Sequence, residues 1–400
     1  MNTLKEGVTA PQGFLASGIN CGIKEKKFDL ALIYSKIKAT TACLYTTNKL
    51  KSAPIVVTKE HLWKNKKASA IIINSGNANT CNGIKGIKDA KAMAVTIASY
   101  LNFQEKEVLV ASTGIIGTPL PIKRITRGTK ELVNKLSENG GHDAALAIMT
   151  TDTVPKEYSC RFKINNKVVT IGGMCKGAGM IHPKLATTLA FITTDISINY
   201  KLLKEALKNS VAKSLNLISI DGDTSPNDMV AILANGKALN DRIVQKDNNF
   251  YKFQKALDEV LINLAQMIVR DGEGATKFIK LHIKNAKNYS QAKKVAFAIA
   301  NSPLVKTTFF GEDLNWGRII NAIGYSDTYL DINKVDIYLG NILIVKNCLK
   351  VSFHKNKLKK ILQEKEIYLK IDLHEGEKEL TIWTTDLSLD YVKINSCYPT

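Results

Sequence analysis

The sequence predicts an α/β protein, and two of its features support this fold class. Short runs rich in β-branched residues alternate with amphipathic stretches of helical spacing, a pattern typical of sheets packed against helices. In addition, 400 residues with 45% hydrophobic content can bury a large core, in one large domain or in two or three smaller ones. We therefore expect a globular protein of mixed class.

The expected elements of the first part of the chain follow from this periodicity. Short apolar runs predict strands at residues 30–35, 54–58, 69–74, 107–112 and 167–172. In residues 253–268, apolar side chains recur at spacings of three and four, which keeps one stripe of a helix facing a core. Residues 203–215 repeat this spacing, so both segments are expected to be helices packed on sheets.

The last hundred residues have a different pattern. Strand-like runs at 335–345, 366–373, 379–387 and 390–394 surround one lysine-rich helical segment. The polar segment KNAKNYSQAKK, residues 284–294, precedes them. We place a domain boundary there, which gives a main domain of residues 1–285 and a smaller mixed domain of residues 286–400.

The net charge of +20 raises the alternative of a basic RNA-associated protein, because basic surfaces bind phosphate by releasing counterions. However, only six of the 56 basic residues are arginine, the side chain best suited to reading bases. The lysines are spread over the whole chain and include runs such as KEKK at 24–27. A solvated lysine-rich surface is the simpler interpretation, so we expect no nucleic-acid partner.

Cysteine and histidine usage indicates neither disulfides nor a metal centre. The seven cysteines are scattered and form no CxxC pair, and the six histidines include no HExxH motif. The first residues lack the apolar segment of a secretory signal, and no apolar run approaches the roughly 20 residues that span a bilayer. We therefore expect a cytoplasmic protein without a membrane partner.

Several polar loops have the spacing of known ligand sites, but most lack an essential residue. DGDTSPND, residues 221–228, resembles a calcium loop in which Pro226 replaces the required glycine. The glycines of residues 171–180 are spaced as in a phosphate loop, but Ala178 stands where the lysine belongs. In ASTGIIG, residues 111–117, Gly114 could bring backbone N–H groups close to an oxygen anion.

The segment KGAGMIHPKLATTLAFITTD, residues 176–195, joins a glycine-rich turn to an apolar strand that contains threonine. A threonine hydroxyl becomes a nucleophile when a base takes its proton, and one known base is the residue's own α-amino group. Thr187 is internal, so this mechanism requires cleavage of the Ala186–Thr187 bond. On local grounds, an ordinary strand threonine is the simpler interpretation.

A series of motifs along the chain, taken in order, favours the nucleophile over the ordinary strand threonine. The series is GFLASGINCGIK, NSGNANTCNG, ASTGIIG, TTDTVPK, KGAGMIHPKLATTLAFITTD, DGDTSPNDM, RDGEGATK, NSPLVKTTFFGEDLNWGR and NSCYPT. It resembles the ornithine acetyltransferases of arginine biosynthesis, also called bifunctional glutamate N-acetyltransferases. The resemblance implies self-cleavage into fragments 1–186 and 187–400, with Thr187 as nucleophile, and a two-fragment α/β sandwich assembled as two copies of each fragment.

The resemblance also implies the roles of individual residues. It places the oxyanion hole at Thr113 and Gly114. The implied substrate contacts are Thr150, Lys176, Thr187, Glu273, Asn395 and Thr400. These residue types suit the substrates, because a lysine can bind the carboxylate of an N-acetyl amino acid and a glutamate can bind the ornithine ammonium. Three positions depart from the family pattern, namely His182, which we expect in a solvated loop, Thr188 and Pro226.

The implied reaction transfers an acetyl group from N-acetylornithine to glutamate through acetyl-Thr187, without a metal or nucleotide cofactor. Acetyl-CoA as an additional donor stays open at the sequence level. Two alternatives also stay open, an amidohydrolase with a threonine nucleophile and the basic RNA-associated protein described above.

Overall fold

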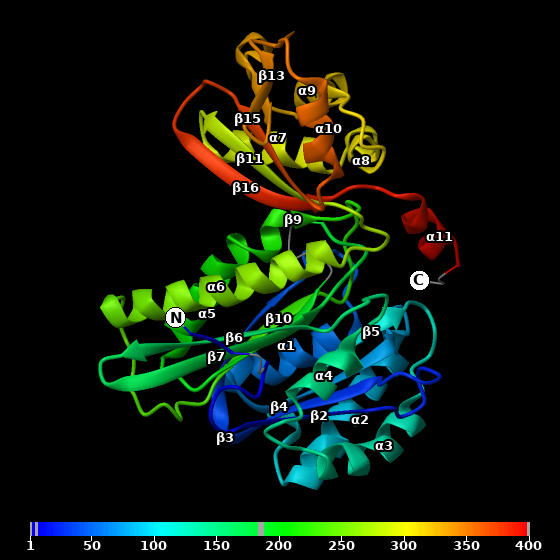
Figure 1. Ribbon diagram of the computed structural model, residues 1–400. Helices are drawn as coiled ribbons and strands as arrows, with labels where there is room; N and C mark the ends of the chain where they lie inside the picture. Colours follow the sequence, from blue (N-terminus) through cyan, green and yellow to red (C-terminus); the bar gives the residue numbers. More distant parts are fainter. Residues whose placement is uncertain (1, 5–6, 183–187, 398–400) are drawn as a thin grey trace.

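A computed structural model describes residues 2–4, 7–182 and 188–397 and has the expected α/β class. Two β-sheets lie one above the other, with the helices α5 (Tyr200–Ala212) and α6 (Asn248–Arg270) between them (Figure 1). Further helices cover the lower part of the first sheet and the second sheet (Figure 1). The protein is thus layered, because each sheet and each helix buries its apolar face against a neighbouring layer.

Among the residues that the structure describes, the first sheet has nine strands. Eight follow the order β1-β6-β7-β8-β10-β3-β4-β5, and the ninth, β2, pairs with β3. The strands are β1 (Asn2–Leu4), β2 (Phe14–Ile19), β3 (Leu30–Tyr45), β4 (Lys67–Asn77), β5 (Val108–Ile115), β6 (Lys156–Ile164), β7 (Lys167–Lys176), β8 (Leu189–Thr194) and β10 (Met229–Ala234). The 16 residues of β3 are long enough for β2 to pair with its first half and β10 with its second half.

Helices cover both faces of this sheet because its strands are apolar on both faces. In β8, Ala190 and Ile192 face the core formed with α5 and α6, while Leu189 and Phe191 face the core that contains α4 (Gly141–Ile148). The β4–β5 end packs against α1 (Ala53–Asn65), α2 (Gly83–Leu101) and α3 (Ile122–Asn134). The short 3₁₀ helix η1 (Glu105–Glu107) leads into β5.

The second sheet has seven strands in the order β14-β13-β12-β15-β11-β16-β9. They are β9 (Ile218–Ser219), β11 (Phe278–Ala286), β12 (Asp336–Leu339), β13 (Ile342–Lys346), β14 (Leu349–Lys350), β15 (Glu366–Asp372) and β16 (Lys378–Thr385). The remaining helices are η2 (Leu215–Leu217), α7 (Tyr289–Ala300), α8 (Pro303–Phe310), α9 (Trp316–Gly324), η3 (Ile332–Lys334), α10 (Lys355–Gln363) and α11 (Leu389–Cys397). Because β9 and all but the last residue of β11 precede residue 286, this sheet extends across the expected boundary, and the division at residue 285 stays a prediction.

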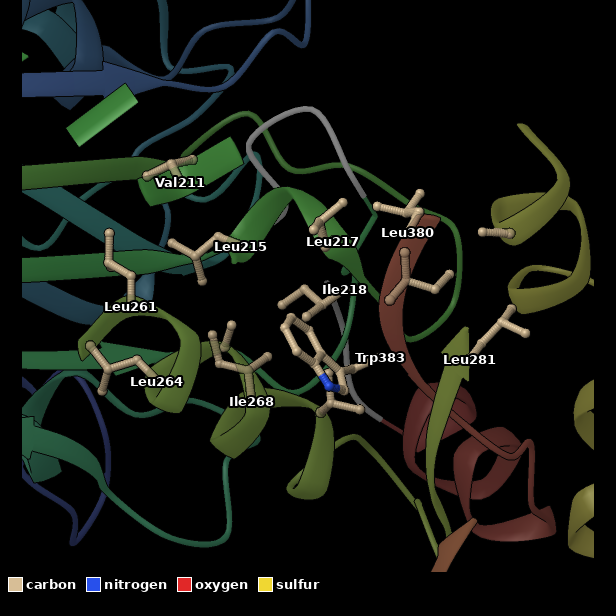
Figure 2. Close-up of a cluster of buried hydrophobic side chains, with 14 of the residues drawn as sticks. Val211, Leu215, Leu217, Ile218, Leu261, Leu264, Ile268, Leu281, Leu380 and Trp383 are labelled. Atoms are coloured by element: carbon tan, nitrogen blue, oxygen red, sulfur yellow. The ribbon is translucent and has the colours of Figure 1, made fainter. Parts of the chain in front are cut away.

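Helix α6 joins the two sheets into one core. Its apolar stripe, expected from residues 253–268, is buried along its length. Leu261, Leu264 and Ile268 lie in the same cluster as Ile218 of β9 and Trp383 of β16 (Figure 2). β9 pairs in parallel with β16 at this point, so the second sheet is fixed on top of α6 by burial of apolar side chains.

Two expected strands are helices in the structure. Residues 54–58 begin α1, where Pro54 occupies the first turn and Ile55, Thr58 and Leu62 are buried at helical spacing. Proline is well suited to that first turn, and burial on a helical face outweighs the β propensity of Ile and Val. Residues 390–394 lie in α11, which has no buried residue. Because apolar side chains do not recur regularly in so short a run, its sequence pattern cannot distinguish a helix from a strand.

Candidate active site

A cavity of about 180 Å³ lies between the ends of β5 and β7, the loops that follow β9 and α6, and α11. It is lined by Thr113, Gly114, Ile116, Thr150, Thr151, Lys176, Gly179, Met180, Asp221, Asp223, Ser225, Asn227, Glu273, Tyr391 and Asn395. Six of the expected site residues are among them, namely Thr113, Gly114, Thr150, Lys176, Glu273 and Asn395. Ala186, Thr187 and Thr400 lie outside the described residues.

The backbone of Gly114 makes a close approach that only glycine permits. Gly114 is the last but one residue of β5 and pairs with Gly76 of the parallel strand β4, with φ of +126°. A Cβ atom there would lie 2.4 Å from the carbonyl carbon of Gly76 and 2.5 Å from the nitrogen of Asn77. Asn227 binds the same strand, because its Nδ2 donates to the carbonyl of Ser112 at 2.8 Å. These contacts hold the end of β5 at the wall of the cavity.

Lys176 supplies a buried positive charge. It ends β7, is 7% exposed, and its Nζ lies 3.4 Å from the hydroxyl oxygen of Thr150. Burial lowers the pKa of Lys176, while the carboxylates of Asp152 and Asp228 oppose this effect. A partly desolvated ammonium with so few partners suits the binding of a substrate carboxylate.

Beneath Lys176, a buried ion-pair network holds the loop that carries Thr150. Asp152 Oδ1 accepts from Lys156 Nζ at 2.6 Å and from the Gly177 nitrogen at 2.8 Å, and Asp152 Oδ2 accepts from the Thr150 nitrogen at 2.9 Å. Lys156 also pairs with Asp271. Burial alone would raise the pKa of Asp152, but the Lys156 and Lys176 ammonium groups lower it to about 2. Asp152 therefore stays ionised at neutral pH.

Replacing Asp152 by alanine is expected to lower the free energy of unfolding by about 3–5 kcal/mol, because it breaks a buried pair and leaves backbone donors unpaired. Since the native pKa lies below the unfolded value of about 3.9, this stabilisation is present above that pH and is lost as the pH falls through about 2. Urea unfolding at pH 7 measures the effect. Glu138→Ala breaks an exposed pair with Lys36 and should change stability by about 1 kcal/mol or less; equal losses in both variants would contradict the role of Asp152.

Glu273 contributes a carboxylate to the lining of the cavity. It follows α6, its nitrogen donates to the carbonyl of Ala178 at 2.8 Å, and its Oε2 accepts from Asn395 Nδ2 at 2.8 Å. A Cβ atom on Gly179 would lie 2.3 Å from Oε2, so the glycine leaves room for this carboxylate. Tyr391 approaches from α11, and burial followed by the Asp221 and Glu273 carboxylates raises its pKa.

The first aspartate of the segment DGDTSPND binds the neighbouring turn. Asp221 Oδ1 accepts from the Ile181 nitrogen at 2.9 Å, and its other oxygen accepts from the Met180 nitrogen. Among the residues that the structure describes, no group of three or more His, Cys, Asp or Glu side chains could hold a metal ion. Asp221, Asn227 and Tyr391 line the cavity but were not predicted from the sequence. Asp221 and Asn227 belong to the polar segment DGDTSPND, whose lack of a metal-binding pattern could have indicated a different role.

The positions that depart from the family pattern have structural partners. Thr188 donates from Oγ1 to the carbonyl of Lys176 at 2.6 Å, and its own carbonyl accepts from the Met229 nitrogen at 3.1 Å. It therefore joins the start of β8 to both neighbours. His182 lies in a loop and is partly buried, edge-on to Phe297 at 6.1 Å between ring centres, so it is less solvated than expected. The carbonyl of Pro226 accepts from the Ser52 nitrogen at 3.1 Å.

Within the described parts of the chain, every helix is too short or too polar to cross a membrane.

Comparison with known proteins places the chain in a family. The model of the ArgJ family matches residues 15–400. The arginine biosynthesis bifunctional protein ArgJ of Caldanaerobacter subterraneus is 48% identical, and that of Symbiobacterium thermophilum is 46% identical, each over the full length of both chains.

Two solved structures also match. One is arginine biosynthesis bifunctional protein ArgJ from Bacillus halodurans, 41% identical, with a TM-score of 0.44 over 47% of this chain and 98% of that chain. The other is ornithine acetyltransferase complexed with ornithine from Mycobacterium tuberculosis, 37% identical, with a TM-score of 0.43 over 47% and 99% of the chains. With matching sequence from residue 15 to residue 400 and full-length identity of nearly one half, the chain belongs to the ArgJ family.

Proposed function

We propose that this protein transfers an acetyl group from N-acetylornithine to glutamate in arginine biosynthesis, releasing ornithine and forming N-acetylglutamate. The observation that carries the proposal is that six expected site residues, from segments far apart in the sequence, line one cavity. Membership of the ArgJ family favours acetyl transfer over both alternatives, a threonine amidohydrolase and an RNA-associated protein.

In this mechanism the chain first cleaves itself between Ala186 and Thr187. The freed α-amino group of Thr187 takes the hydroxyl proton as Oγ attacks the acetyl carbonyl. Backbone and side-chain donors at Thr113 and Gly114 stabilise the oxyanion, and the C–N bond breaks to release ornithine. Glutamate then attacks acetyl-Thr187 through its amino group and takes the acetyl group, which restores the hydroxyl.

The charges of the cavity suit both amino acids. Lys176 would bind the carboxylate that N-acetylornithine and glutamate share, next to the hydroxyl of Thr150. Glu273, held by Asn395, would bind the side-chain ammonium of ornithine. Thr400 is proposed as a further substrate contact.

The same proposal covers the partners of the enzyme. The reaction as written needs no metal or nucleotide cofactor. The two fragments stay associated and form a tetramer with two copies of each, in the cytoplasm. The word "bifunctional" in the names of the relatives supports a second donor, for which we propose acetyl-CoA.

Purified protein incubated with N-acetylornithine and glutamate should form ornithine and N-acetylglutamate in equal amounts. Replacing N-acetylornithine by acetyl-CoA tests the second donor in the same assay. Release of acetate in place of N-acetylglutamate would favour the amidohydrolase, and inactivity with both donors would contradict the proposed function.

Replacing Glu273 by glutamine should lower kcat/KM for N-acetylornithine by about 10- to 150-fold, because a charge-assisted hydrogen bond is worth about 1.5–3 kcal/mol. The effect should be smaller for acetyl-CoA as donor, which lacks the ornithine ammonium. Glu366→Gln changes an exposed carboxylate paired with Arg270 and should leave kcat/KM unchanged. An equal loss with both donors would mean that Glu273 does not recognise ornithine.

A further inference from the structure

Two open clefts adjoin the cavity of the candidate active site, beside the loop that joins β2 to β3. The apolar residues that line the larger cleft, of about 810 Å³, are Phe28, Leu146, Met149 and Ile394. The smaller cleft, of about 430 Å³, is lined by residues 23–27, Gly76, Ile115 and Thr150. Thr150 lines the cavity and both clefts, and Lys27 lines both clefts. The three hollows therefore adjoin one another at Thr150.

The loop between β2 and β3 packs against the strand that neighbours the proposed oxyanion hole. Gly76 of β4 has φ of +93° and pairs with Gly114 of β5. A Cβ atom on Gly76 would lie 2.9 Å from Cγ2 of Ile23 and 3.1 Å from Cγ of Lys24. A single strand, β4, thus lies between the Lys24 side chain and Gly114.

Hydrogen bonds within the loop hold its backbone. The Asp29 carboxylate accepts from the nitrogens of Ile23 at 2.6 Å and Lys24 at 2.9 Å. Asn20 Nδ2 donates to the carbonyls of Lys24 at 3.0 Å and Lys27 at 2.5 Å. A loop held in this way loses little conformational entropy when it binds a ligand.

Lys24 brings a positive charge to the junction of the hollows. Its Nζ donates to the carbonyl of Met149 at 2.8 Å. Burial lowers the pKa of Lys24 to about 8; the Asp29 carboxylate opposes this effect, and the ammonium groups of Lys27 and Lys176 add to it. Lys24 is therefore close enough to both lysines for repulsion, which an anionic ligand beside them would relieve.

The rest of the run KEKK, residues 24–27, extends this charge to the surface. Lys26 and Lys27 are exposed and line the smaller cleft together with Glu25. Three lysines against one glutamate leave the run cationic. Because a lysine ammonium binds phosphate as a point charge, the run is suited to a ligand that carries phosphate groups.

The two clefts and the cavity match the three parts of a coenzyme A thioester, which are a phosphorylated nucleotide, a pantetheine arm with apolar groups, and a reactive acyl group. We propose that the clefts bind acetyl-CoA. The arm lies in the larger cleft, along Phe28, Leu146 and Ile394, and directs the acetyl group past Thr150 into the cavity. The phosphates lie against Lys26 and Lys27. This inference rests on the proposed use of acetyl-CoA as second donor and adds the place where that donor binds.

The double variant Lys26→Gln/Lys27→Gln tests the phosphate contacts, because both side chains are exposed. Isothermal titration calorimetry of the purified full-length protein with coenzyme A measures the affinity without a transfer step. We expect Kd to rise about 5- to 30-fold, since two charge-assisted contacts are lost at a solvent-exposed site. The matched control Lys163→Gln/Lys167→Gln removes the same charge from the exposed hairpin between β6 and β7 and should leave Kd within about twofold of wild type.

Kinetics with S-acetylpantetheine, which has the arm but no phosphate, separate recognition of charge from disturbed folding. Lys26→Gln/Lys27→Gln should lower kcat/KM for acetyl-CoA by about 5- to 30-fold and change that for S-acetylpantetheine by less than about twofold. Leu146→Ala should lower kcat/KM for both thioesters by about 3- to 20-fold, because both have the arm. The loss should be smaller for N-acetylornithine, which lacks the arm.

Wild-type protein that does not bind coenzyme A, or an equal Kd in wild type and Lys26→Gln/Lys27→Gln, would overturn the inference. Equal losses of that variant with acetyl-CoA and S-acetylpantetheine would overturn it as well. Failure of the proposed function is distinguishable, since it would show as protein that binds coenzyme A through Lys26 and Lys27 but transfers no acetyl group from either donor.

Discussion

Replacing Thr187 by alanine is expected to leave one chain of 400 residues and to abolish acetyl transfer, while the wild-type protein separates into fragments 1–186 and 187–400. The substitution removes the hydroxyl that we propose as the nucleophile of both self-cleavage and transfer. Loss of a nucleophile of this kind lowers kcat by about 10⁴- to 10⁶-fold. Denaturing electrophoresis and N-terminal sequencing measure cleavage, and the second wild-type fragment should begin TTLAF.

Thr188→Val is the matched control for this prediction. Thr188 is the next residue and binds the Lys176 carbonyl through its hydroxyl, so its loss should destabilise the strand pairing by about 1 kcal/mol. Cleavage should persist. Uncleaved wild-type protein with full transferase activity, or an active Thr187→Ala variant, would show that Thr187 is not the nucleophile.

The second large effect is expected from Gly114→Ala. A methyl group there would meet the Gly76 and Asn77 backbone at about 2.4–2.5 Å, and φ of +126° disfavours any side chain. The backbone around Gly114 must therefore shift, which displaces the proposed oxyanion donors. Removal of one such donor lowers kcat by about 10²- to 10³-fold, and we expect a loss of this size or larger in steady-state assays.

Gly117→Ala separates backbone strain from loss of the oxyanion hole. Gly117 also has positive φ, +80°, but a Cβ atom there would meet no atom within 4 Å. The variant should lose stability and keep kcat within about threefold of wild type. Similar kcat losses in both variants would indicate that general strain, and not the Gly114 turn, controls the rate.

The elements that the sequence predicted correctly are those whose burial repeats along the chain. The apolar runs at 30–35, 69–74 and 167–172 lie in β3, β4 and β7, and the stripe at 253–268 lies in α6. Residues 54–58 were wrongly predicted as a strand because Ile55 and Val57 have the β propensity of a strand while their burial follows a helix. A five-residue run cannot distinguish these cases.

The candidate site was predictable only as far as family motifs reach. Lys176 and Glu273 were expected from the resemblance, and the structure brings them to one cavity. Asp152 was missed although its partner Lys156 is only four residues away, because Asp271, which completes the buried network, lies more than a hundred residues along the chain. Tertiary pairing of this kind has no local signature.

The most direct measurement is a single turnover with N-acetylornithine that carries a labelled acetyl group, in the absence of glutamate. We expect the label to remain on fragment 187–400, to map to Thr187 in the digested peptide, and to leave as N-acetylglutamate when glutamate is added. Active enzyme that carries no label on either fragment, with initial-rate plots that intersect instead of running parallel, would contradict an acetyl-threonine intermediate.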